Sequence, residues 1–268
     1  MKTEIIIIGA CGRMGRHLIA AVNETRTARL AGAVEIKGHK LIGSDAGECA
    51  GVGRLGCIIS DDLEKVLQKG QVVIDFSQAE ATIKNLRTIV AGKAKAVIGT
   101  TGLSEKQRQE IKAASKKTAV MFASNMSIGM NLLFKLTRDV AAFLGQDYDI
   151  EIVEAHHRFK KDAPSGSAKT LAEMAAAGLH QNLKDTGIYG RNGMVGERKR
   201  GEIGVHAVRA GDIIGDHTVM FGALGERLEL RHQAHSRETF ARGAVRAALW
   251  LANKRSGLFD MQDVLGLR

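Results

Sequence analysis

The residues from Glu154 to Ser167, Glu-Ala-His-His-Arg-Phe-Lys-Lys-Asp-Ala-Pro-Ser-Gly-Ser, gather side chains that move protons and bind anions. Histidine and lysine are residue types that act as general acids and bases. So many neighbouring cations would repel one another unless an anion lay among them. Ser165-Gly166-Ser167 then opens a predicted helix, whose free N–H groups could hold a carboxylate. The segment therefore predicts a functional loop, and a solvated basic loop without function is the alternative.

No metal site is expected in this loop. The adjacent His156 and His157 are not accompanied by further His, Cys or carboxylate ligands at metal spacing. The three cysteines, Cys11, Cys49 and Cys57, are odd in number and form no C-x-x-C pair, which is typical of reduced cytosolic thiols. Cys11 lies near a predicted helix N-terminus, which could lower its pKa, but nothing nearby makes it a nucleophile. We interpret all three as structural.

A glycine-rich turn, Gly9-Ala10-Cys11-Gly12-Arg13-Met14-Gly15, directly follows a predicted strand. Its glycines are spaced G-x-x-G-x-x-G, not G-x-G-x-x-G, but such a turn still lets backbone N–H groups and a helix N-terminus face a pyrophosphate. Glu35 lies 20 residues past Gly15, where an acid that binds the adenosine ribose is expected. A plain turn beside a surface glutamate is the alternative. The strand, turn, helix, strand and acid together favour a dinucleotide site.

Two further polar turns follow predicted parallel strands. They are Gly99-Thr100-Thr101-Gly102 and Ala123-Ser124-Asn125-Met126. Ligands of open α/β sheets bind beyond the carboxyl ends of the strands, which is where these turns are expected. Taken singly, each is equally consistent with ordinary turn chemistry.

The elements that must position these residues alternate up to about Asn125. Short apolar runs predict strands, and apolar residues at helical spacing predict helices between them. Ser77-Gln78-Ala79-Glu80 reads as a capping box, and Ser104 as an N-cap. The predicted order is strand Glu4–Gly9, helix Gly12–Glu24, strand Arg29–Ile36, strand Gln71–Asp75, helix from Ser77 to Val90, strand Lys95–Ile98, helix from Ser104 to Lys116, and strand Thr118–Ala123. This alternation predicts a doubly wound parallel sheet of Rossmann type.

The pattern then changes. Three consecutive predicted strands separated by glycines suggest an antiparallel or mixed sheet. The predicted elements are helix Met130–Phe143, strand Asp149–Ala155, helix Ser167–Ala177, strands Ile203–Arg209, Ile213–Phe221 and Arg227–His235, and helix Phe240–Ala252. The fold class is thus α/β, with a Rossmann-type domain and a second α+β domain that contains a mixed sheet.

Composition excludes several classes. The 268 residues are 44% hydrophobic and 25% charged, which rules out disordered and fibrous chains. The net charge is +10, but aromatic residues make up only 4% and no RNP-like motif is present, so nucleic acid is not an expected partner. A basic surface that steers a small polyanion explains the charge equally well. The N-terminal apolar run is too short for a signal peptide, and no run suggests a membrane span, so we expect a soluble cytoplasmic protein.

Over essentially its whole length the chain resembles the 4-hydroxy-tetrahydrodipicolinate (dihydrodipicolinate) reductase family of bacterial lysine and diaminopimelate biosynthesis. The Glu-Ala-His-His motif, followed by Lys and then Asp-Ala-Pro-Ser-Gly, is highly specific. The matching segments are Gly9–Gly15, Gly43–Gly47, Val97–Gly102, Glu154–Arg158, Asp162–Gly166, Arg209–Asp212 and Ser256–Asp260.

The resemblance implies NAD(P)H-dependent reduction of a cyclic unsaturated dicarboxylate to tetrahydrodipicolinate. It implies that His156 donates or accepts a proton and that Lys160 donates one. The residues implied to grip the substrate carboxylates are His157, Ser165, Gly166 and Ser167. The residues implied to contact the cofactor are Gly9, Ala10, Cys11, Gly12, Arg13, Met14, Glu35, Gly99, Thr100, Thr101, Ala123, Ser124, Asn125 and Met126.

The resemblance also implies a domain organisation. Residues 1–126 and 237–268 would form the dinucleotide-binding domain, because the last helix and tail return to it. Residues 127–236 would form the domain that binds substrate and assembles a homotetramer. The small dicarboxylate substrate and identical subunits are then the expected partners, with no nucleic acid and no membrane.

Three positions depart from the family pattern. Ile36 stands where an Arg often follows the ribose acid, Gln78 replaces another frequent Arg, and Ser167 stands where Thr is commoner. Glu35 favours NADH and repels the 2′-phosphate of NADPH. Lys37 could reach that phosphate only as a single point charge. We therefore expect the chain to use both cofactors, with NADH at least as good as NADPH.

Two other functions remain open from the residues alone. One is an oxidoreductase of related architecture, such as an aspartate or amino-acid dehydrogenase. The other is a non-catalytic protein that senses dinucleotides, for which proton carriers at His156 and Lys160 would have no use.

Overall fold

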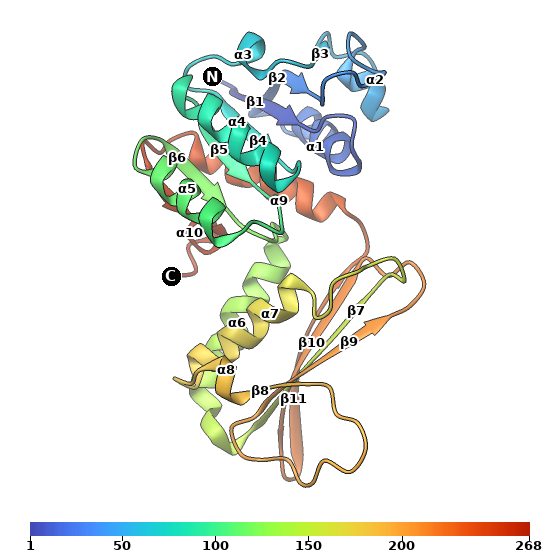
Figure 1. The fold of residues 1–268 in the computed structure, drawn as a ribbon, viewed down its shortest axis with the longest axis vertical. Coiled ribbons are helices and arrows are strands. Elements are labelled where there is room, and N and C mark those ends of the chain that lie inside the picture. The colour runs from blue at the N-terminus through green and yellow to red at the C-terminus, as the bar shows by residue number, and fades with distance from the viewer. The chain divides into compact units, whose positions relative to one another are not determined.

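The structure, a computed structural model, describes residues 1–268 and divides the chain into two compact units. Unit 1 comprises Met1–Ile128, Arg237–Gly266 and Arg268, and unit 2 comprises Gly129–Ser236 and Leu267. After unit 2 the chain returns to unit 1, where Arg237–Gly266 lies among the N-terminal elements (Figure 1). No helix in the chain has both the length and the apolar character needed to cross a membrane.

Unit 1 is built on a seven-stranded parallel sheet. In spatial order its strands are β12 (Gly257–Phe259), β6 (Ala119–Phe122), β5 (Lys95–Ile98), β4 (Val72–Asp75), β1 (Thr3–Ile8), β2 (Ala28–Val34) and β3 (Ile59–Ser60). The reversal of strand order beside β1 is the switch point at which open α/β sheets bind their ligands. The C-terminal strand β12 completes one edge.

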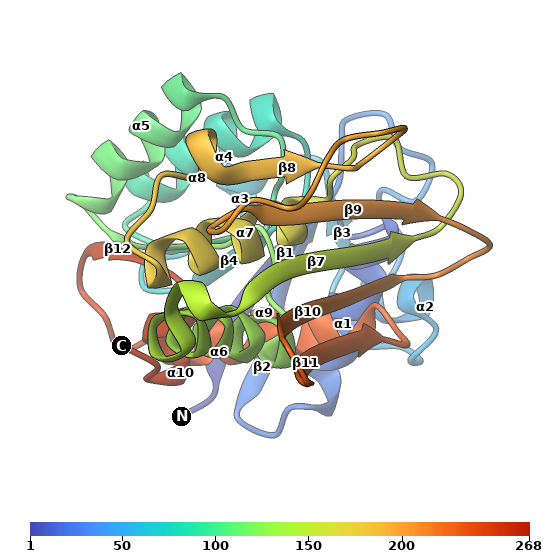
Figure 2. The same cartoon turned by 90° about the horizontal axis from the view of Figure 1, so that it is seen from below.

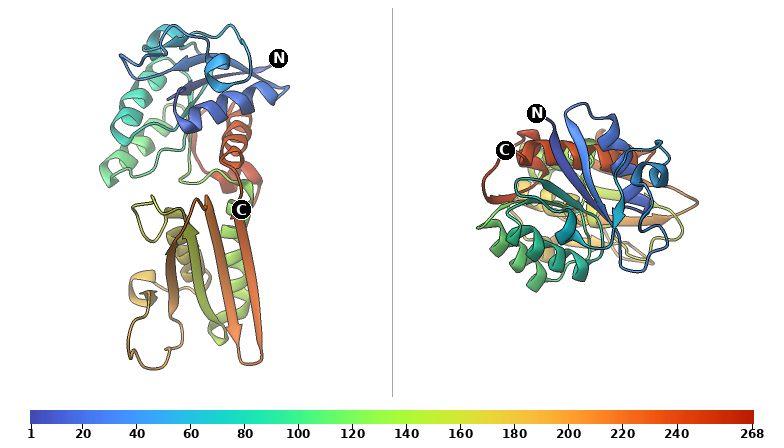
Figure 3. Two further views of the ribbon diagram at one scale, coloured as in Figure 1. Left: turned by 90° about the vertical axis from the view of Figure 1, so that its right-hand side faces the viewer. Right: turned by 90° about the horizontal axis from the view of Figure 1, so that it is seen from above.

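Helices cover both faces of this sheet (Figure 3). Alternate residues of a strand point to opposite faces, so Ile5 and Ile7 pack with one helix pair, and Ile6 and Ile8 with the other. The first pair is α1 (Arg13–Glu24) and α9 (Glu238–Leu251), and the second pair is α4 (Ala79–Ala91) and α5 (Glu105–Ser115). Because both faces are buried, the strands are continuously apolar, as their residues predicted.

Unit 2 is a five-stranded mixed sheet, with its strands side by side in Figure 2. Its order is β11 (Glu226–Ala234), β10 (Gly215–Ala223), β7 (Asp149–His156), β9 (Ile203–Arg209) and β8 (Gly187–Tyr189). The pairs β11–β10 and β10–β7 are antiparallel, whereas β7–β9 and β9–β8 are parallel. Helices α6 (Ile128–Leu144) and α7 (Gly166–Gly178) pack on one face of the sheet. The predicted fold class is confirmed.

Most predicted elements lie within a few residues of their observed bounds, and the strands at Lys95–Ile98 and Ile203–Arg209 match at both ends. Several short elements were not predicted because they are too short to show a periodicity. They are α2 (Ala46–Ala50), β3, α3 (Leu63–Val66), the 3₁₀ turn Gly145–Asp147, α8 (Leu183–Thr186), β8, β12 and α10 (Met261–Leu265).

The predicted capping box at Ser77 is wrong. The N-cap of α4 is Gln78, whose side chain makes no capping hydrogen bond. Ser77 Oγ instead donates to Asp75 Oδ1 at 2.6 Å, and the Ser77 N–H donates to the same oxygen at 2.8 Å. Asp75 is 1% exposed, and a buried carboxylate requires such donors.

Candidate active site

The glycine-rich turn of unit 1 is shaped by the close approach of its own backbone. Gly9 has φ +73°, and a Cβ on Gly15 would lie 2.1 Å from the Gly9 carbonyl oxygen. The Gly12 N–H donates to that same carbonyl at 3.0 Å. Gly12 is the N-cap of α1 and offers no side chain to cap the helix, so the N–H groups of its first turn can receive an anionic ligand. The turn therefore has the form of a pyrophosphate cradle.

Glu35 is brought to this turn from the end of β2. Its Oε2 accepts the Cys11 N–H at 2.9 Å, and its Oε1 accepts the Ile36 N–H at 2.9 Å. These two backbone donors orient the carboxylate beside the cradle. Ile36 is 72% exposed, and Lys37 is also exposed on the same segment.

The Cys11 thiol differs from its expected state. Burial, together with the neighbouring Cys49 thiol, raises the pKa of Cys11 to about 12. The expected lowering by the helix N-terminus is therefore wrong, because loss of hydration outweighs the helix dipole. The thiol stays neutral, and the polar contact of Cys11 with this part of the chain is its backbone N–H, which donates to Glu35.

A cavity of about 290 Å³ lies at the carboxyl edge of the parallel sheet. Its lining residues are Met14, Phe76, Ser77, Gly99, Thr100, Thr101, Ser124, Asn125, Met126 and Phe240. The structure thus brings together residues from the two polar turns and the first turn of α1, as their strand-end positions predicted. Ala123 lies at the end of β6, where its N–H donates to the Ile98 carbonyl at 3.2 Å.

Three lining residues were missed. Phe76 and Ser77 directly follow β4, so the same strand-edge rule could have found them. The Phe76 ring lies over Gly99, where an added Cβ would stand 2.3 Å from the ring. Phe240 comes from α9 after the whole of unit 2, and no local signal marks it.

Thr100, which lines the cavity, connects two elements through its side chain. It is 3% exposed, and its Oγ1 lies 2.7 Å from Thr82 Oγ1. This hydroxyl pair ties the end of β5 to the first turn of α4, while Thr101 is exposed. The hydroxyl of Thr100 is therefore buried and engaged within the protein.

In unit 2 a buried carboxylate organises the histidine loop. Glu154 is fully buried, and its Oε2 lies 2.6 Å from His156 Nδ1. Both of its oxygens also accept from Arg209, each at 2.9 Å, and Oε1 accepts the Ser165 N–H at 3.0 Å. Burial alone would raise the pKa of Glu154, but the hydrogen bonds from His156, Arg209 and Ser165 outweigh it and hold the pKa at about 2. The carboxylate is therefore ionised at neutral pH.

The start of α7 is fixed from inside. Ser165 is the N-cap, 2% exposed, and its Oγ accepts the Ala168 N–H at 3.1 Å. Gly166 is exposed, and the space that a Cβ would occupy there is open. Of the predicted carboxylate receptors, Ser165 is thus buried and caps the helix, whereas Gly166 is exposed at the helix start.

The lysine of the loop is held by a neighbour. Lys160 Nζ donates to Asp162 Oδ1 at 2.9 Å, and the Lys160 N–H donates to the His157 carbonyl at 3.0 Å. The Lys160 side chain is 21% exposed. His157 is half-buried, with its ring centroid 6.3 Å from that of Phe159.

His217 on β10 is a further buried histidine that the sequence did not single out. Its ring meets that of His156 edge to face at 5.2 Å, and its Nε2 lies 3.2 Å from Ser165 Oγ. Burial, with the neighbouring His156, lowers the pKa of His217 to about 4. It is therefore neutral at pH 7 and contributes hydrogen bonding and packing, not charge.

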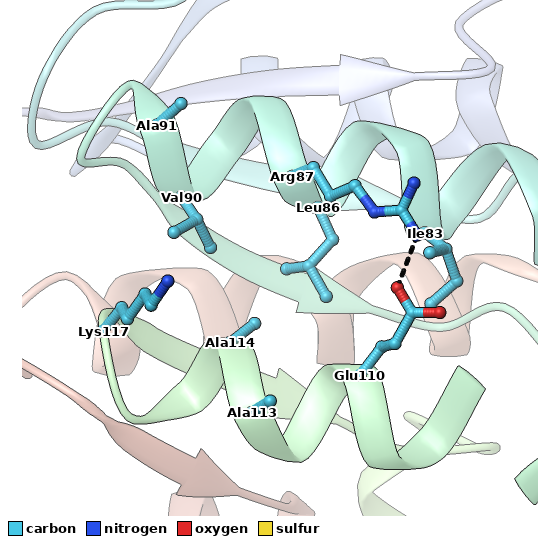
Figure 4. Close-up of a pocket in the computed structure, with 9 residues that line it drawn as sticks. All are labelled: Ile83, Leu86, Arg87, Val90, Ala91, Glu110, Ala113, Ala114 and Lys117. Atoms are coloured by element: carbon cyan, nitrogen blue, oxygen red, sulfur yellow. Dashed lines mark hydrogen bonds and ion pairs between the residues drawn. The ribbon is translucent and has the colours of Figure 1, made fainter. Parts of the chain in front are cut away.

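A larger hollow lies elsewhere on unit 1. A hollow of about 450 Å³ lies between α4 and α5, and its apolar lining includes Ile83, Leu86 and Val90, which Figure 4 shows as sticks. Arg87 and Glu110 form an ion pair of 2.7 Å across it. None of the residues predicted from the sequence lines this hollow, and its apolar lining offers no set of proton-transfer groups.

Two family models cover almost the whole chain. The model described as dihydrodipicolinate reductase, N-terminus, matches residues 3–126, and the one described as dihydrodipicolinate reductase, C-terminus, matches residues 129–265. A curated 4-hydroxy-tetrahydrodipicolinate reductase from Magnetococcus marinus is 50% identical over 268 residues, which is 100% of each chain.

Solved structures share the fold. A dipicolinate-bound dihydrodipicolinate reductase from Paenisporosarcina sp. TG-14 is 24% identical with a TM-score of 0.74, covering 98% of this chain and 99% of that one. GenD2 from gentamicin A biosynthesis, in complex with NAD, is 13% identical with a TM-score of 0.65, covering 99% and 91%. On its two family matches and its full-length relative, the chain belongs to the dihydrodipicolinate reductase family, the NAD(P)H-dependent oxidoreductases of lysine and diaminopimelate biosynthesis.

Proposed function

We propose that the carboxyl-edge residues of unit 1 bind the nicotinamide dinucleotide and that the histidine loop of unit 2 binds the ring dicarboxylate and supplies its proton. The substrate is 4-hydroxy-tetrahydrodipicolinate, which loses one water molecule to give dihydrodipicolinate, and this ring is then reduced to tetrahydrodipicolinate. Reduction of the ring consumes one hydride and one proton, and the bound NAD(P)H supplies the hydride. The chain's own residues must therefore bind two anionic molecules and deliver the proton.

The dinucleotide fits the features of unit 1. The backbone at Gly9 and Gly15 packs closely and carries no side chain that would block a ligand. The first turn of α1 has no side-chain cap, so its N–H groups suit a pyrophosphate. The Glu35 carboxylate, already oriented by two N–H groups, retains lone pairs for ribose hydroxyls. The cavity beyond β5 and β6 suits the nicotinamide half. These features support the assignment of residues 1–126 and 237–268 to cofactor binding.

The single observation that carries the proton-transfer role is the 2.6 Å contact between Glu154 and His156. A carboxylate that is ionised at neutral pH beside Nδ1 fixes the orientation of the imidazole and leaves Nε2 as the nitrogen that exchanges a proton. Gly215 keeps the space beside that nitrogen free, since a Cβ there would lie 3.1 Å from Nε2. His156 thus has the arrangement of an oriented acid–base group.

Lys160 is proposed as the proton donor, and His157 with the start of α7 as the carboxylate receptors. Lys160 and His157 lie within one loop and carry N–H donors, and the exposed Gly166 and half-buried Ser167 begin the helix that follows it. The dipicolinate bound to the Paenisporosarcina reductase is a flat ring with two carboxylates, which is the shape that two separate receptors would accept. These points support assignment of residues 127–236 to substrate binding.

We further propose that the chain acts in the cytoplasm as a homotetramer assembled through unit 2. One face of the mixed sheet is covered by α6 and α7, and residues on the other face are exposed or half-buried. The resemblance to the family supports assembly through that domain. The two alternative functions, an amino-acid dehydrogenase and a dinucleotide sensor, are not favoured by the family membership.

The test is the pair of variants His156→Ala and Lys160→Ala, assayed by nicotinamide absorbance with freshly made substrate. Each should lower kcat by about 10²-fold or more, the scale of a positioned acid or base. NADH binding, measured by fluorescence, should stay at the parental value because the proposed cofactor residues belong to unit 1. If both variants keep near-parental kcat, the loop is not the active site.

A further inference from the structure

Arg209 is the last residue of β9 and the first residue of the segment Arg209–Asp212. In the parallel register of β7 and β9 it pairs with His156. The pairing continues beyond the strands, since the Ala210 N–H donates to the His156 carbonyl at 2.9 Å and the Arg158 N–H to the Gly211 carbonyl at 3.1 Å. The segment therefore runs alongside the histidine loop.

One side of the Arg209 guanidinium reaches the carboxylate behind His156. Its Nη1 donates to Glu154 Oε2 and its Nη2 to Glu154 Oε1, each at 2.9 Å. Without this bidentate pair the carboxylate would be buried with only His156 and one backbone N–H as partners. A buried charge that loses a partner is strongly destabilised, so Arg209, together with His156 and the Ser165 N–H, keeps Glu154 ionised at Nδ1 of His156.

The other side of the guanidinium contacts Asp162, the residue whose carboxylate binds Lys160. Arg209 Nη2 also donates to the backbone carbonyl of Asp162 at 2.6 Å. The side chain of that same residue accepts from Lys160 Nζ at 2.9 Å. Arg209 thus holds the backbone of the residue that holds the lysine.

We propose that Arg209 is a positioning residue that sets His156, through Glu154, and Lys160, through Asp162, in one fixed arrangement. The inference rests on the proposed roles of His156 and Lys160 in the reaction. Arg209 itself transfers no proton and is assigned no contact with substrate. Its planar fork suits the two links, because Nη1 and Nη2 donate in parallel to the two oxygens of Glu154 while Nη2 also donates to the Asp162 carbonyl, whereas a lysine ammonium is a single point charge without that fixed geometry.

The test compares Arg209→Ala and Arg209→Lys with a matched control, Arg191→Ala. Arg191 also binds both oxygens of a glutamate on β7, Glu151, at 2.9 and 3.0 Å. Glu151 is three residues from Glu154 on the strand, so its side chain lies on the opposite face of the sheet. We expect kcat of Arg209→Ala to fall by about 10²-fold, the loss typical of a small misplacement of reacting groups. Arg209→Lys should recover little of the lost kcat, and Arg191→Ala should keep the parental kcat.

Chemical rescue separates positioning from a merely structural role. Added guanidinium ion should raise kcat of folded Arg209→Ala several-fold at unchanged NADH affinity, and should not raise kcat of Arg191→Ala or of Arg209→Lys. A kcat of Arg209→Ala within twofold of the parent would overturn the proposal, as would a loss that appears only in KM.

Asp162→Ala keeps the proposal open to refutation if Arg209→Ala does not fold. The Asp162 side chain is 59% exposed, so its removal does not threaten the core. We expect its kcat to fall by about tenfold or more because Lys160 loses its anchor, and an unchanged kcat would overturn the proposal. If His156→Ala and Lys160→Ala keep activity, the proposed function itself fails; if they lose activity and the Arg209 variants do not, only this inference fails.

Discussion

A side chain on Gly15 would begin inside the turn that precedes it, because its Cβ would lie 2.1 Å from the carbonyl oxygen of Gly9. Real Cβ atoms do not approach an oxygen so closely, and the oxygen belongs to the backbone, which cannot swing aside. Gly15→Ala should therefore lower the free energy of unfolding by about 1–3 kcal/mol, the usual cost of overpacking. It should also weaken NADH binding by about tenfold or more, since the cradle must open to admit the methyl group.

Gly12→Ala provides the graded control, measured without cofactor by urea unfolding. Its Cβ would lie 3.2 Å from the same Gly9 oxygen, a contact that a shift of a few tenths of an ångström relieves. Its loss of stability should therefore be clearly smaller than that of Gly15→Ala. Equal losses in the two variants would contradict this explanation of the turn.

Cofactor preference should follow the residues beside Glu35. The carboxylate repels a 2′-phosphate, and the exposed Ile36 offers it no bidentate partner. We expect dual use, with kcat/KM for NADH at least equal to that for NADPH. Ile36→Arg should shift the preference toward NADPH by about 1–2 kcal/mol, the scale of a charged hydrogen bond.

Lys37→Ala completes that series, since it removes the cation that follows Ile36 in the chain. It should lower kcat/KM for NADPH selectively and leave kcat/KM for NADH unchanged in steady-state assays. A parental preference for NADPH above about tenfold, or ~1.4 kcal/mol, would show that another residue holds the phosphate.

Inhibition should require two carboxylates. In the proposed site, His157 with Lys160 is one carboxylate receptor, and the start of α7 at Gly166 is the other. Pyridine-2,6-dicarboxylate should compete with substrate, and pyridine-2-carboxylate should be much weaker, as measured by inhibition constants at fixed NADH. Equal inhibition by the two compounds would remove the two-receptor arrangement.

Stability should depend on pH through His217. Its pKa is lowered from 6.5 to about 4 in the folded chain, chiefly by burial. Between these values the unfolded chain binds more protons, so the free energy of unfolding should fall as pH is lowered from about 6.5 toward 4. The slope from one such group is at most about 1.4 kcal/mol per pH unit.

His217→Gln tests this assignment because it can keep a hydrogen bond to Ser165 and cannot take up the proton. Urea unfolding at a series of pH values should give a flatter slope than that of the parent between about pH 6.5 and 4. A variant whose slope equals that of the parent would show that other groups cause the acid dependence.

Much of the fold was available from the sequence because its signals are local. The isoleucine run before Gly9, the spacing of glycines to Gly15 and the acid at Glu35 each depend on a few neighbouring residues and their backbone preferences. Alternation of such segments was sufficient to predict the parallel sheet, and consecutive strands after Ile203 were sufficient to predict the mixed one. The histidine loop was identified for the same reason, since its chemistry is contiguous in the chain.

Only the tertiary structure decided which distant residues complete the two sites. Phe240 lines the cavity with Thr100 although 140 positions separate them. Arg209 donates to Glu154 because β9 pairs with β7 in the observed register. The ring of His217, on β10, packs edge to face against that of His156 in the protein interior. Register and burial arise from packing between elements far apart in the chain, and no local pattern encodes them. The sequence thus determined what chemistry is present, and the packing determined which buried charges support it.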